Sequence, residues 1–292
     1  IMLRQFVVTV GLASSLTFAQ DLLAPDATFV QVDTGMKLVE GPLWLPDGRL
    51  IASEIRANTV HAYDAEGNQL EAFLQPSGNA NGHALDLEGR VIQAEHDRRV
   101  TRIEADGSVT VLAESYEGKR LNSPNDVAVK SDGTIYFTDP PFGLGKNKGD
   151  LGFQGIYRLN LETSELILLN ADFEQPNGIA FSPDESILYV TDTKTKSLLA
   201  FPVNADGTLG ESQTIGKGAD GLRVDANGNI WVTSGAEDLY IYAPDGTLLE
   251  TLQLPEPTTN LTFGGPTGQT LFVTTIYSIF KIETLTTEAP RP

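Results

Sequence analysis

A nine-residue pattern recurs six times in this chain, and it limits the possible folds more than any other feature. Each copy begins with a polar residue that carries a side-chain oxygen, continues through a short apolar stretch, and reaches a turn position eight residues later. The turn position is glycine in every copy except the fourth, where it is Glu185. The six copies begin at Glu40, Asn81, Asn125, Asn177, Asp220 and Asn260.

A run rich in β-branched and aromatic residues follows each turn, as expected of a β-strand. These runs are residues 50–53, 91–94, 135–138, 188–191, 230–233 and 271–274. Consecutive copies begin 40 to 52 residues apart, a spacing that suits the four-stranded blade of a β-propeller. No helical periodicity extends far enough to compete. The sequence therefore predicts an all-β, six-bladed β-propeller.

The two ends of the chain bear on how such a ring closes. Only 32 residues follow Asn260, too few for a full blade and a tail, and an open sheet edge would invite pairing with other chains. Residues 28–32 alternate in strand fashion, so we expect them to supply the missing strand of the last blade. Residues 284–292 are expected to form a loose tail. We predict a single propeller domain over residues 21–292.

Residues 1–20 have the features of a secretory signal peptide. Arg4 precedes an apolar run from residue 6 to 16, and Thr17 and Ala19 place small side chains around a cleavage site after Ala19. The run is too short to span a membrane comfortably. We therefore expect a periplasmic or secreted protein that has no membrane association.

Composition excludes several classes of function. The net charge of −19 and the absence of a Lys/Arg-rich run argue against nucleic-acid binding. The chain has no cysteine, which excludes disulfides, thiolate zinc sites, iron–sulfur clusters and cysteine nucleophiles. Gly-x-Ser-x-Gly and His-Glu-x-x-His motifs are also absent. The acidic balance instead favours the attraction of cations.

The six polar residues that begin the repeats form a candidate binding site. The innermost strand of each blade lines the central channel of a propeller, so residues that begin these strands face one end of the channel together. Two of the six are carboxylates, whose charge balances a divalent ion, and oxygen-only ligands are typical of Ca²⁺. The alternative is that these residues only cap strands or form Asx turns. The pattern predicts a site for a metal or a polar substrate.

Other polar residues are expected near the same face. One set consists of the residues that end the strand after each turn, and we favour the interpretation that they cap these strands. Its members are Glu54, Glu95, Asp139, Asp192, Ser234 and Thr275. His96 is either structural or an acid, base or substrate donor that titrates near neutral pH, whereas His61 is expected to be exposed and His83 to pack. The loop over residues 140–155 is a candidate lid or specificity loop, or ordinary length variation.

An ordered set of motifs within residues 35–282 resembles the SMP-30/gluconolactonase (regucalcin-like) family. The motifs are Glu40-Gly-Pro, Ala-Glu95-His96, Asn122-Ser-Pro-Asn125-Asp126, Phe137-Thr-Asp139-Pro, Pro176-Asn177-Gly and Ala219-Asp220-Gly. The resemblance implies a Ca²⁺-type cation, with Zn²⁺ or Mn²⁺ as alternatives, and hydrolysis of sugar lactones. It assigns the cation to residues that match family ligands, namely Glu40, Asn125, Asn177 and Asp220. Some relatives carry arginine where Ser123 stands, so a substrate contact is missing and the sugar is left open.

The hypothesis that follows is metal-dependent opening of a lactone ring by water, with the carbonyl polarised by the cation. Asp220 is the candidate general base, and direct attack by Asp220 is the alternative. Asn81, His96, Asp126 and Asn260 are the candidate substrate-binding or orienting residues.

Two other functions fit the same features. An organophosphate triester hydrolase would use the same metal to polarise a P=O bond, and a non-catalytic propeller would use its faces for binding, since one fold hosts many functions. The expected partner is a small-molecule sugar lactone, and the chain is a monomer or a dimer.

Overall fold

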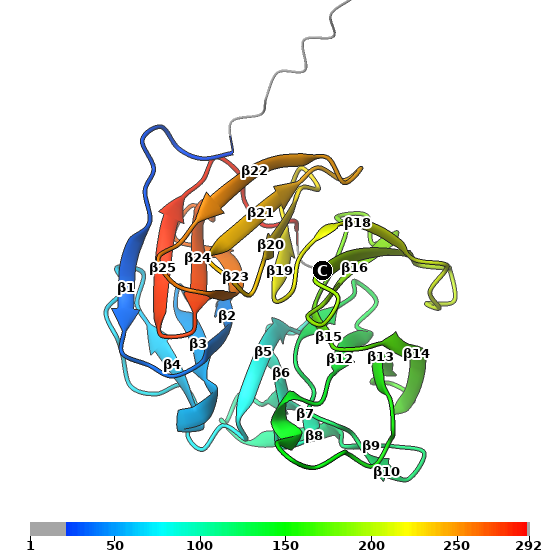
Figure 1. The fold of residues 1–292 in the computed structure, drawn as a ribbon. Helices are drawn as coiled ribbons and strands as arrows, with labels where there is room; N and C mark the ends of the chain where they lie inside the picture. Colours follow the sequence, from blue (N-terminus) through cyan, green and yellow to red (C-terminus); the bar gives the residue numbers. More distant parts are fainter. Residues whose placement is uncertain (1–21, 291–292) are drawn as a thin grey trace, which may run out of the picture.

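The computed structural model describes residues 22–290 of the 292-residue chain, and six blade-like antiparallel sheets surround a central axis (Figure 1). The predicted six-bladed β-propeller is therefore confirmed. The predicted signal peptide of residues 1–20 lies outside the described residues. Within the described range, no helix has the length and apolar character needed to cross a membrane.

Each blade begins at the axis with its first strand and continues outward. Blade 1 has three strands, β2 (Val39–Trp44), β3 (Leu50–Glu54) and β4 (Thr59–Tyr63). Blade 2 contains β5 (Ala80–Leu85), β6 (Val91–Glu95), β7 (Arg99–Ile103) and β8 (Val109–Ala113). Blade 3 contains β11 (Val127–Val129), β12 (Ile135–Asp139), β13 (Gln154–Asn160) and β14 (Glu165–Phe173).

The second half of the ring repeats this arrangement. Blade 4 contains β15 (Pro176–Phe181), β16 (Ile187–Asp192), β17 (Ser197–Pro202) and β18 (Gln213–Lys217). Blade 5 contains β19 (Leu222–Val224), β20 (Ile230–Thr233), β21 (Asp238–Tyr242) and β22 (Leu248–Gln253). Blade 6 contains β23 (Thr258–Gly264), β24 (Thr270–Thr275), β25 (Ser278–Glu283) and β1 (Val30–Thr34).

Short elements connect these blades. A small hairpin of β9 (Ser115–Tyr116) and β10 (Lys119–Arg120) lies between blades 2 and 3. One-turn 3-10 helices cover Ile55–Ala57 (η1) and Phe142–Leu144 (η2).

Blade 6 closes the ring with strands from both ends of the chain. The early strand β1 pairs antiparallel with the last strand β25, with Val30 opposite Lys281 and Thr34 opposite Ser278. Figure 1 shows the blue and red segments side by side in one sheet. The prediction that an N-terminal segment supplies the missing strand is confirmed, although the strand covers 30–34 rather than 28–32.

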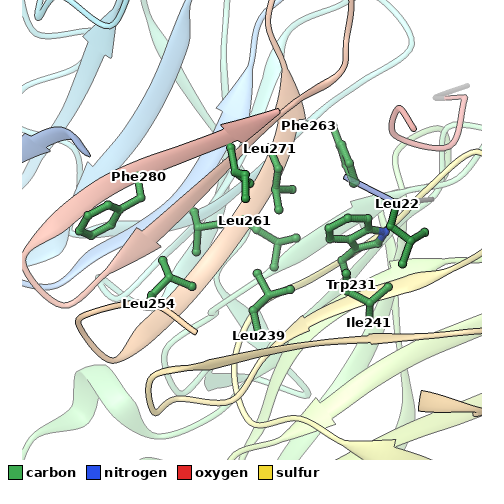
Figure 2. Close-up of a cluster of buried hydrophobic side chains, with 11 residues drawn as sticks. Leu22, Trp231, Leu239, Ile241, Leu254, Leu261, Phe263, Leu271 and Phe280 are labelled. Atoms are coloured by element: carbon green, nitrogen blue, oxygen red, sulfur yellow. The ribbon is translucent and has the colours of Figure 1, made fainter. Parts of the chain in front are cut away.

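Apolar side chains are buried between the blades rather than in one central core. Among the described residues there are six buried clusters, one at each contact between neighbouring blades. Figure 2 shows the cluster between blades 5 and 6, where Trp231 and Leu239 face Leu261 and Leu271. Both faces of a second strand are covered by neighbours, which explains why these strands are apolar almost throughout.

The turn position of the repeat requires a left-handed backbone. The φ angle at this position is +87° at Gly48 and +85° at Gly228, and it is +57° at Glu185, the one copy without glycine. Glycine adopts this conformation without strain. At Glu185 the carboxylate accepts bonds of 2.6 Å from both the backbone nitrogen and the hydroxyl of Ser131 in the neighbouring turn. These contacts hold Glu185 in the left-handed conformation, which is unfavourable for a residue other than glycine.

Glycines next to the repeat-initial residues permit close approach of neighbouring inner strands. A Cβ placed on Gly41 would lie 1.8 Å from the carbonyl oxygen of Asn81, and one on Gly221 would lie 2.1 Å from the amide carbon of Asn260. The backbone nitrogen of Gly82 donates to the carbonyl of Asn125 across the same kind of gap, at 2.8 Å. The sequence pairs Glu-Gly, Asn-Gly and Asp-Gly therefore bring the polar residues together at the axis.

The replacement Gly41→Ala tests this close approach. Gly41 has a φ of +47°, and its new Cβ would overlap backbone atoms that cannot move aside as a side chain can. We expect a loss of about 3 kcal/mol or more in unfolding free energy, measured by thermal or urea unfolding. The control is Gly48→Ala, where φ is +87° and nothing lies within 4 Å. It should lose only about 1 kcal/mol, and equal losses in the two variants would contradict the overlap.

The prediction of a loose C-terminal tail is wrong for the part that the structure describes. The backbone nitrogen of Leu285 donates to Leu22, and that of Ala289 donates to Val224, each at 2.9 Å. The segment thus runs from blade 6 across to the inner strand of blade 5. Backbone hydrogen bonds hold it there, together with side-chain contacts such as that of Glu288 with Arg223 at 3.8 Å.

Candidate active site

The six repeat-initial residues lie in the six inner strands or, for Asn125 and Asp220, two residues before them, and they lie at the same end of the ring. Five of them are almost completely buried, and Asp220 keeps partial exposure. Their register is fixed because hydroxyls on the second strands bond the backbone of the next blade. Ser53 donates to the carbonyl of Asn81 at 3.1 Å, and Thr138 donates to that of Asn177 at 2.7 Å. The sequence prediction that these residues share one end of the channel agrees with this arrangement.

Two of these residues, Glu40 and Asp220, form a buried pair of carboxyl groups. Burial raises the pKa of Glu40 to about 7, and the nearby charge of Asp126 contributes to this rise. Burial raises the pKa of Asp220 well above its usual value, with further increases from the charge of Glu40 and a hydrogen bond to it. Two buried carboxyl groups that are in hydrogen-bond contact cannot both ionise without a large cost in free energy unless a positive charge compensates them.

Asn260 and Asp126 lie beside Glu40 and act on it in opposite directions. The side chain of Asn260 lowers the pKa of the carboxyls of both Glu40 and Asp126, whereas the charge of Asp126 raises the pKa of Glu40. Asp126 has no exposed surface, and its Oδ1 accepts a 2.9 Å bond from the backbone of Val127. The sequence predicted substrate-binding or orienting roles for Asp126 and Asn260. Both side chains are buried beside Glu40.

Several buried oxygens at this end of the channel have no hydrogen-bond partner. They include Oδ1 of Asn177 and Oδ1 of Asp220, together with Oδ1 of Asn81. Buried polar atoms are nearly always paired, so unpartnered oxygens beside two acids indicate a missing positive or donating group. Within residues 22–290, no group of three or more His, Asp or Glu side chains forms a metal cluster. The donor set is a mixture of carboxylates and amides, which suits a hard cation such as Ca²⁺.

His96 lies against Asn81 and is neutral at physiological pH. The amide nitrogen of Asn81 lies 3.2 Å from Nε2 of His96. With the amide as donor, Nε2 accepts and the ring proton is on Nδ1. Burial lowers the pKa of His96 to about 4. The expectation that His96 titrates near neutral pH is therefore wrong, and a role as a neutral hydrogen-bonding group is what its environment allows.

The residues that end the second strands mostly bond local groups. Glu54 accepts from the backbone of Lys37 at 2.9 Å, and Asp192 accepts from the backbone of Glu174 at 2.9 Å. Asp139 accepts from the backbone of Asn122 at 2.8 Å, and burial raises its pKa to about 7. The interpretation of these residues as strand caps agrees with the contacts.

The long loop of residues 140–155 packs beside His96. A Cβ on Gly143 would lie 2.7 Å from Cβ of His96 and 2.8 Å from Cβ of Ser123, so the loop fits closely between blades 2 and 3. The backbone nitrogen of Gly143 donates to the hydroxyl of Ser123 at 2.8 Å, and Arg98 forms a 2.7 Å ion pair with Asp150. Ser123 thus anchors this loop at the candidate site.

Sequence reasoning missed a buried arginine below the ring. Arg223 lies 3.7 Å from Asp126 on one side and 3.8 Å from Glu288 on the other. It lines a cavity of about 110 Å³ in the lower channel, together with His83. A signal for Arg223 was present in the sequence. It stands three residues after Asp220, at a repeat position that is leucine, alanine or phenylalanine in the other five copies.

Comparison with known proteins identifies several relatives. A sequence profile of the SMP-30/gluconolactonase/LRE-like region matches residues 38–277. The gluconolactonase of Zymomonas mobilis subsp. mobilis is 29% identical over 321 residues, covering 95% of this chain and 87% of that protein. The pentonolactonase of Haloferax volcanii is 28% identical over 258 residues, covering 84% and 83%. Among solved structures, a gluconolactonase from Xanthomonas campestris is 34% identical, with a TM-score of 0.83 and coverage of 89% and 90%.

Proposed function

Because the chain belongs to the SMP-30/gluconolactonase/LRE-like family, we propose that it hydrolyses sugar lactones at the channel end that holds Glu40 and Asp220. The relatives that cover most of its length are lactone hydrolases. The observation that carries this proposal is the set of unpartnered buried oxygens on Asn177 and Asp220 beside the carboxyl of Glu40. These groups fit a divalent cation, with Ca²⁺ as the first choice and Zn²⁺ or Mn²⁺ as alternatives.

Glu40, Asn125, Asn177 and Asp220 would hold this cation. Once bound, it would polarise the lactone carbonyl and stabilise the negative charge that develops on the carbonyl oxygen. The positive charge would also keep Glu40 and Asp220 ionised, since a nearby cation lowers the pKa of a carboxyl group. Asn260 holds the carboxyl of Glu40 in place, and Arg223 offsets the charge of Asp126 behind it.

Asp220 is the group that we propose removes a proton from the attacking water. It is more exposed than the other five ring residues, and its Oδ1 has no partner within the protein. An ionised carboxylate with a free lone pair is able to accept that proton and then donate it to the ring oxygen as the acyl C–O bond breaks, so that this oxygen becomes a hydroxyl of the same hydroxy-acid product.

We assign binding of the sugar to Asn81 and His96. Oδ1 of Asn81 has no partner and accepts hydrogen bonds, whereas Nδ1–H of the neutral His96 donates them. Sugar hydroxyls both donate and accept, so the two side chains together fit a polyhydroxylated substrate.

The direct test is to measure the hydrolysis of glucono-δ-lactone and of a pentonolactone, with a pH-stat that titrates the acid as it is released. Protein treated with EDTA should show only the spontaneous rate, and Ca²⁺, Zn²⁺ or Mn²⁺ added singly should restore turnover. A folded protein that turns over neither lactone with any of the three ions would contradict the proposal. If such a protein instead hydrolyses a phosphotriester such as paraoxon, the alternative function of an organophosphate triester hydrolase is favoured.

A further inference from the structure

Two threonines at the end of β16 contact Asn177 and Asp220 or the residues next to them. Thr191 lies within the strand and Thr193 follows it, so their hydroxyls are two residues apart at the same end of blade 4. Both hydroxyls bridge from the inner strand of blade 4 to the segment just before the inner strand of blade 5. This junction joins two of the proposed cation ligands.

Thr193 fixes the orientation of the Asn177 side-chain amide. Its hydroxyl lies 2.5 Å from the carbonyl oxygen of Ala219 and 2.9 Å from the amide nitrogen of Asn177. A carbonyl only accepts, so the single hydroxyl proton goes to Ala219 and the hydroxyl oxygen accepts from Asn177. The amide nitrogen therefore gives one of its two protons to Thr193, the Asn177 side chain also lowers the pKa of the neighbouring Asp220 carboxyl, and Oδ1 is left as the atom without a partner.

Thr191 fixes the separation of the two backbones. It has no exposed surface, and its hydroxyl accepts a 2.9 Å bond from the backbone nitrogen of Gly178. The same hydroxyl donates its proton to the carbonyl of Asp220 at 2.7 Å. One hydroxyl thus connects the residue after Asn177 directly to Asp220.

The same repeat position orients a second ring asparagine. The residue that follows the second strand is Thr193 in blade 4 and His96 in blade 2, and each lies against the amide nitrogen of the asparagine of its own blade. In both blades Oδ1 of that asparagine has no partner. With an acceptor at this position, as assigned to His96 by the bond from the Asn81 amide, the oxygen rather than the nitrogen of the amide is left without a partner.

We propose that Thr191 and Thr193 are positioning residues that set the geometry of Asn177 and Asp220 for cation binding. This inference rests on the proposed function, because it takes both residues as ligands. Thr193 presents the oxygen of Asn177, and Thr191 holds Asp220 at a fixed distance from it. Neither threonine is among the proposed ligands.

The test is isothermal titration of Ca²⁺ alone into protein freed of metal by EDTA and desalting. Thr193→Val keeps the shape of the side chain but removes its acceptor, so the Asn177 amide is free to turn. We expect its Kd for Ca²⁺ to rise by about tenfold or more, as for other partners of metal ligands. Thr193→Ser retains the hydroxyl and should stay within about threefold of wild type. Thr191→Val should weaken Ca²⁺ binding in the same direction.

Thr284→Val is the matched control for lost hydroxyl bonds. Thr284 is buried at the opposite end of blade 6, and its hydroxyl donates toward the carbonyls of Gln269 at 2.9 Å and Thr286 at 2.7 Å. This variant should lower Tm and leave the Kd for Ca²⁺ unchanged. A Thr193→Val protein that binds Ca²⁺ as tightly as wild type would overturn the assignment of Thr193. A wild-type protein that binds no Ca²⁺ would instead overturn the Ca²⁺ site of the proposed function.

Discussion

Replacement of Asp220 by asparagine is expected to lower kcat/KM for lactone hydrolysis by about 10³-fold or more. Asparagine keeps the shape of the side chain, but it has no negative charge and cannot accept a proton from water. Loss of a general base alone typically costs 10²- to 10⁴-fold, and the same change removes one of the two carboxylates proposed to hold the cation. Steady-state rates measured by pH-stat, with Ca²⁺ present throughout, give the ratio.

Asp225→Asn is the control for the loss of a buried carboxylate in the same blade. Asp225 has no exposed surface, and it accepts bonds from the backbone of Asn229 at 2.9 Å and from the indole of Trp231 at 3.1 Å. Its replacement should lower Tm while kcat/KM at 25 °C stays within about threefold of wild type, because its partners are structural. Near-normal turnover by Asp220→Asn would remove Asp220 from the mechanism.

A measurement of Ca²⁺ binding separates the two roles of Asp220. If Asp220→Asn binds Ca²⁺ with a moderately raised Kd and yet is inactive at saturating Ca²⁺, the lost function is proton transfer. If Ca²⁺ binding disappears, the dominant role is as a ligand. Mutant kinetics alone cannot make this distinction, since both losses lower kcat/KM.

The fold could be predicted from the sequence because the turn and the strand of each repeat require particular residue types within a few positions of one another. A left-handed turn requires glycine at a fixed distance from the polar residue, and a strand buried on both faces requires an apolar run after it. These are short-range demands, so they leave a regular pattern. The docking of residues 284–290 left no such pattern, because it depends on backbone bonds such as that from Ala289 to Val224 and on single side-chain contacts such as that of Glu288 with Arg223, which do not repeat along the chain.

The candidate ring could be predicted because register alone places its members. What register does not reveal is which atoms are left unpartnered and which side chains support the ring from the adjacent blade. Thr193 and Arg223 matter through contacts with residues 16 and 97 positions away, respectively. His96 shows the same limit, since its low pKa comes from burial that only the folded ring creates.

Removal of the cation is expected to make the protein less stable as the pH rises. In cation-free protein, burial raises the pKa of Glu40 from 4.5 to about 7, whereas the unfolded chain has an ordinary carboxyl group. Between about pH 4.5 and 7 the folded state therefore holds a proton that the unfolded state has released. The unfolding free energy falls through this window, by about 1.4 kcal/mol per unit of pKa difference, or roughly 3 kcal/mol for Glu40.

The stabilisation that added Ca²⁺ gives should increase as the pH rises, which is the opposite of the trend in the cation-free protein. Glu40 of the cation-free protein holds a proton at pH 5 and has lost it at pH 8, so fewer protons compete with the cation and Ca²⁺ binds more tightly at pH 8. A concentration of about 100 times Kd adds about 2.7 kcal/mol, or roughly 5 °C in Tm for a chain of this size. Thermal unfolding in EDTA and in Ca²⁺ at pH 5 and pH 8 gives the four values needed.

Asp139 provides the control because it shares the raised pKa but lies outside the ring. Burial raises its pKa to about 7, so Asp139→Asn should reduce the pH dependence seen in EDTA and leave the response to Ca²⁺ intact. Asp220→Asn should abolish most of the response to Ca²⁺, since it removes a proposed ligand. A rise in Tm with Ca²⁺ that is as large at pH 5 as at pH 8 would show that protons and Ca²⁺ do not compete for Glu40 and Asp220. The cation would then have to bind elsewhere on the protein.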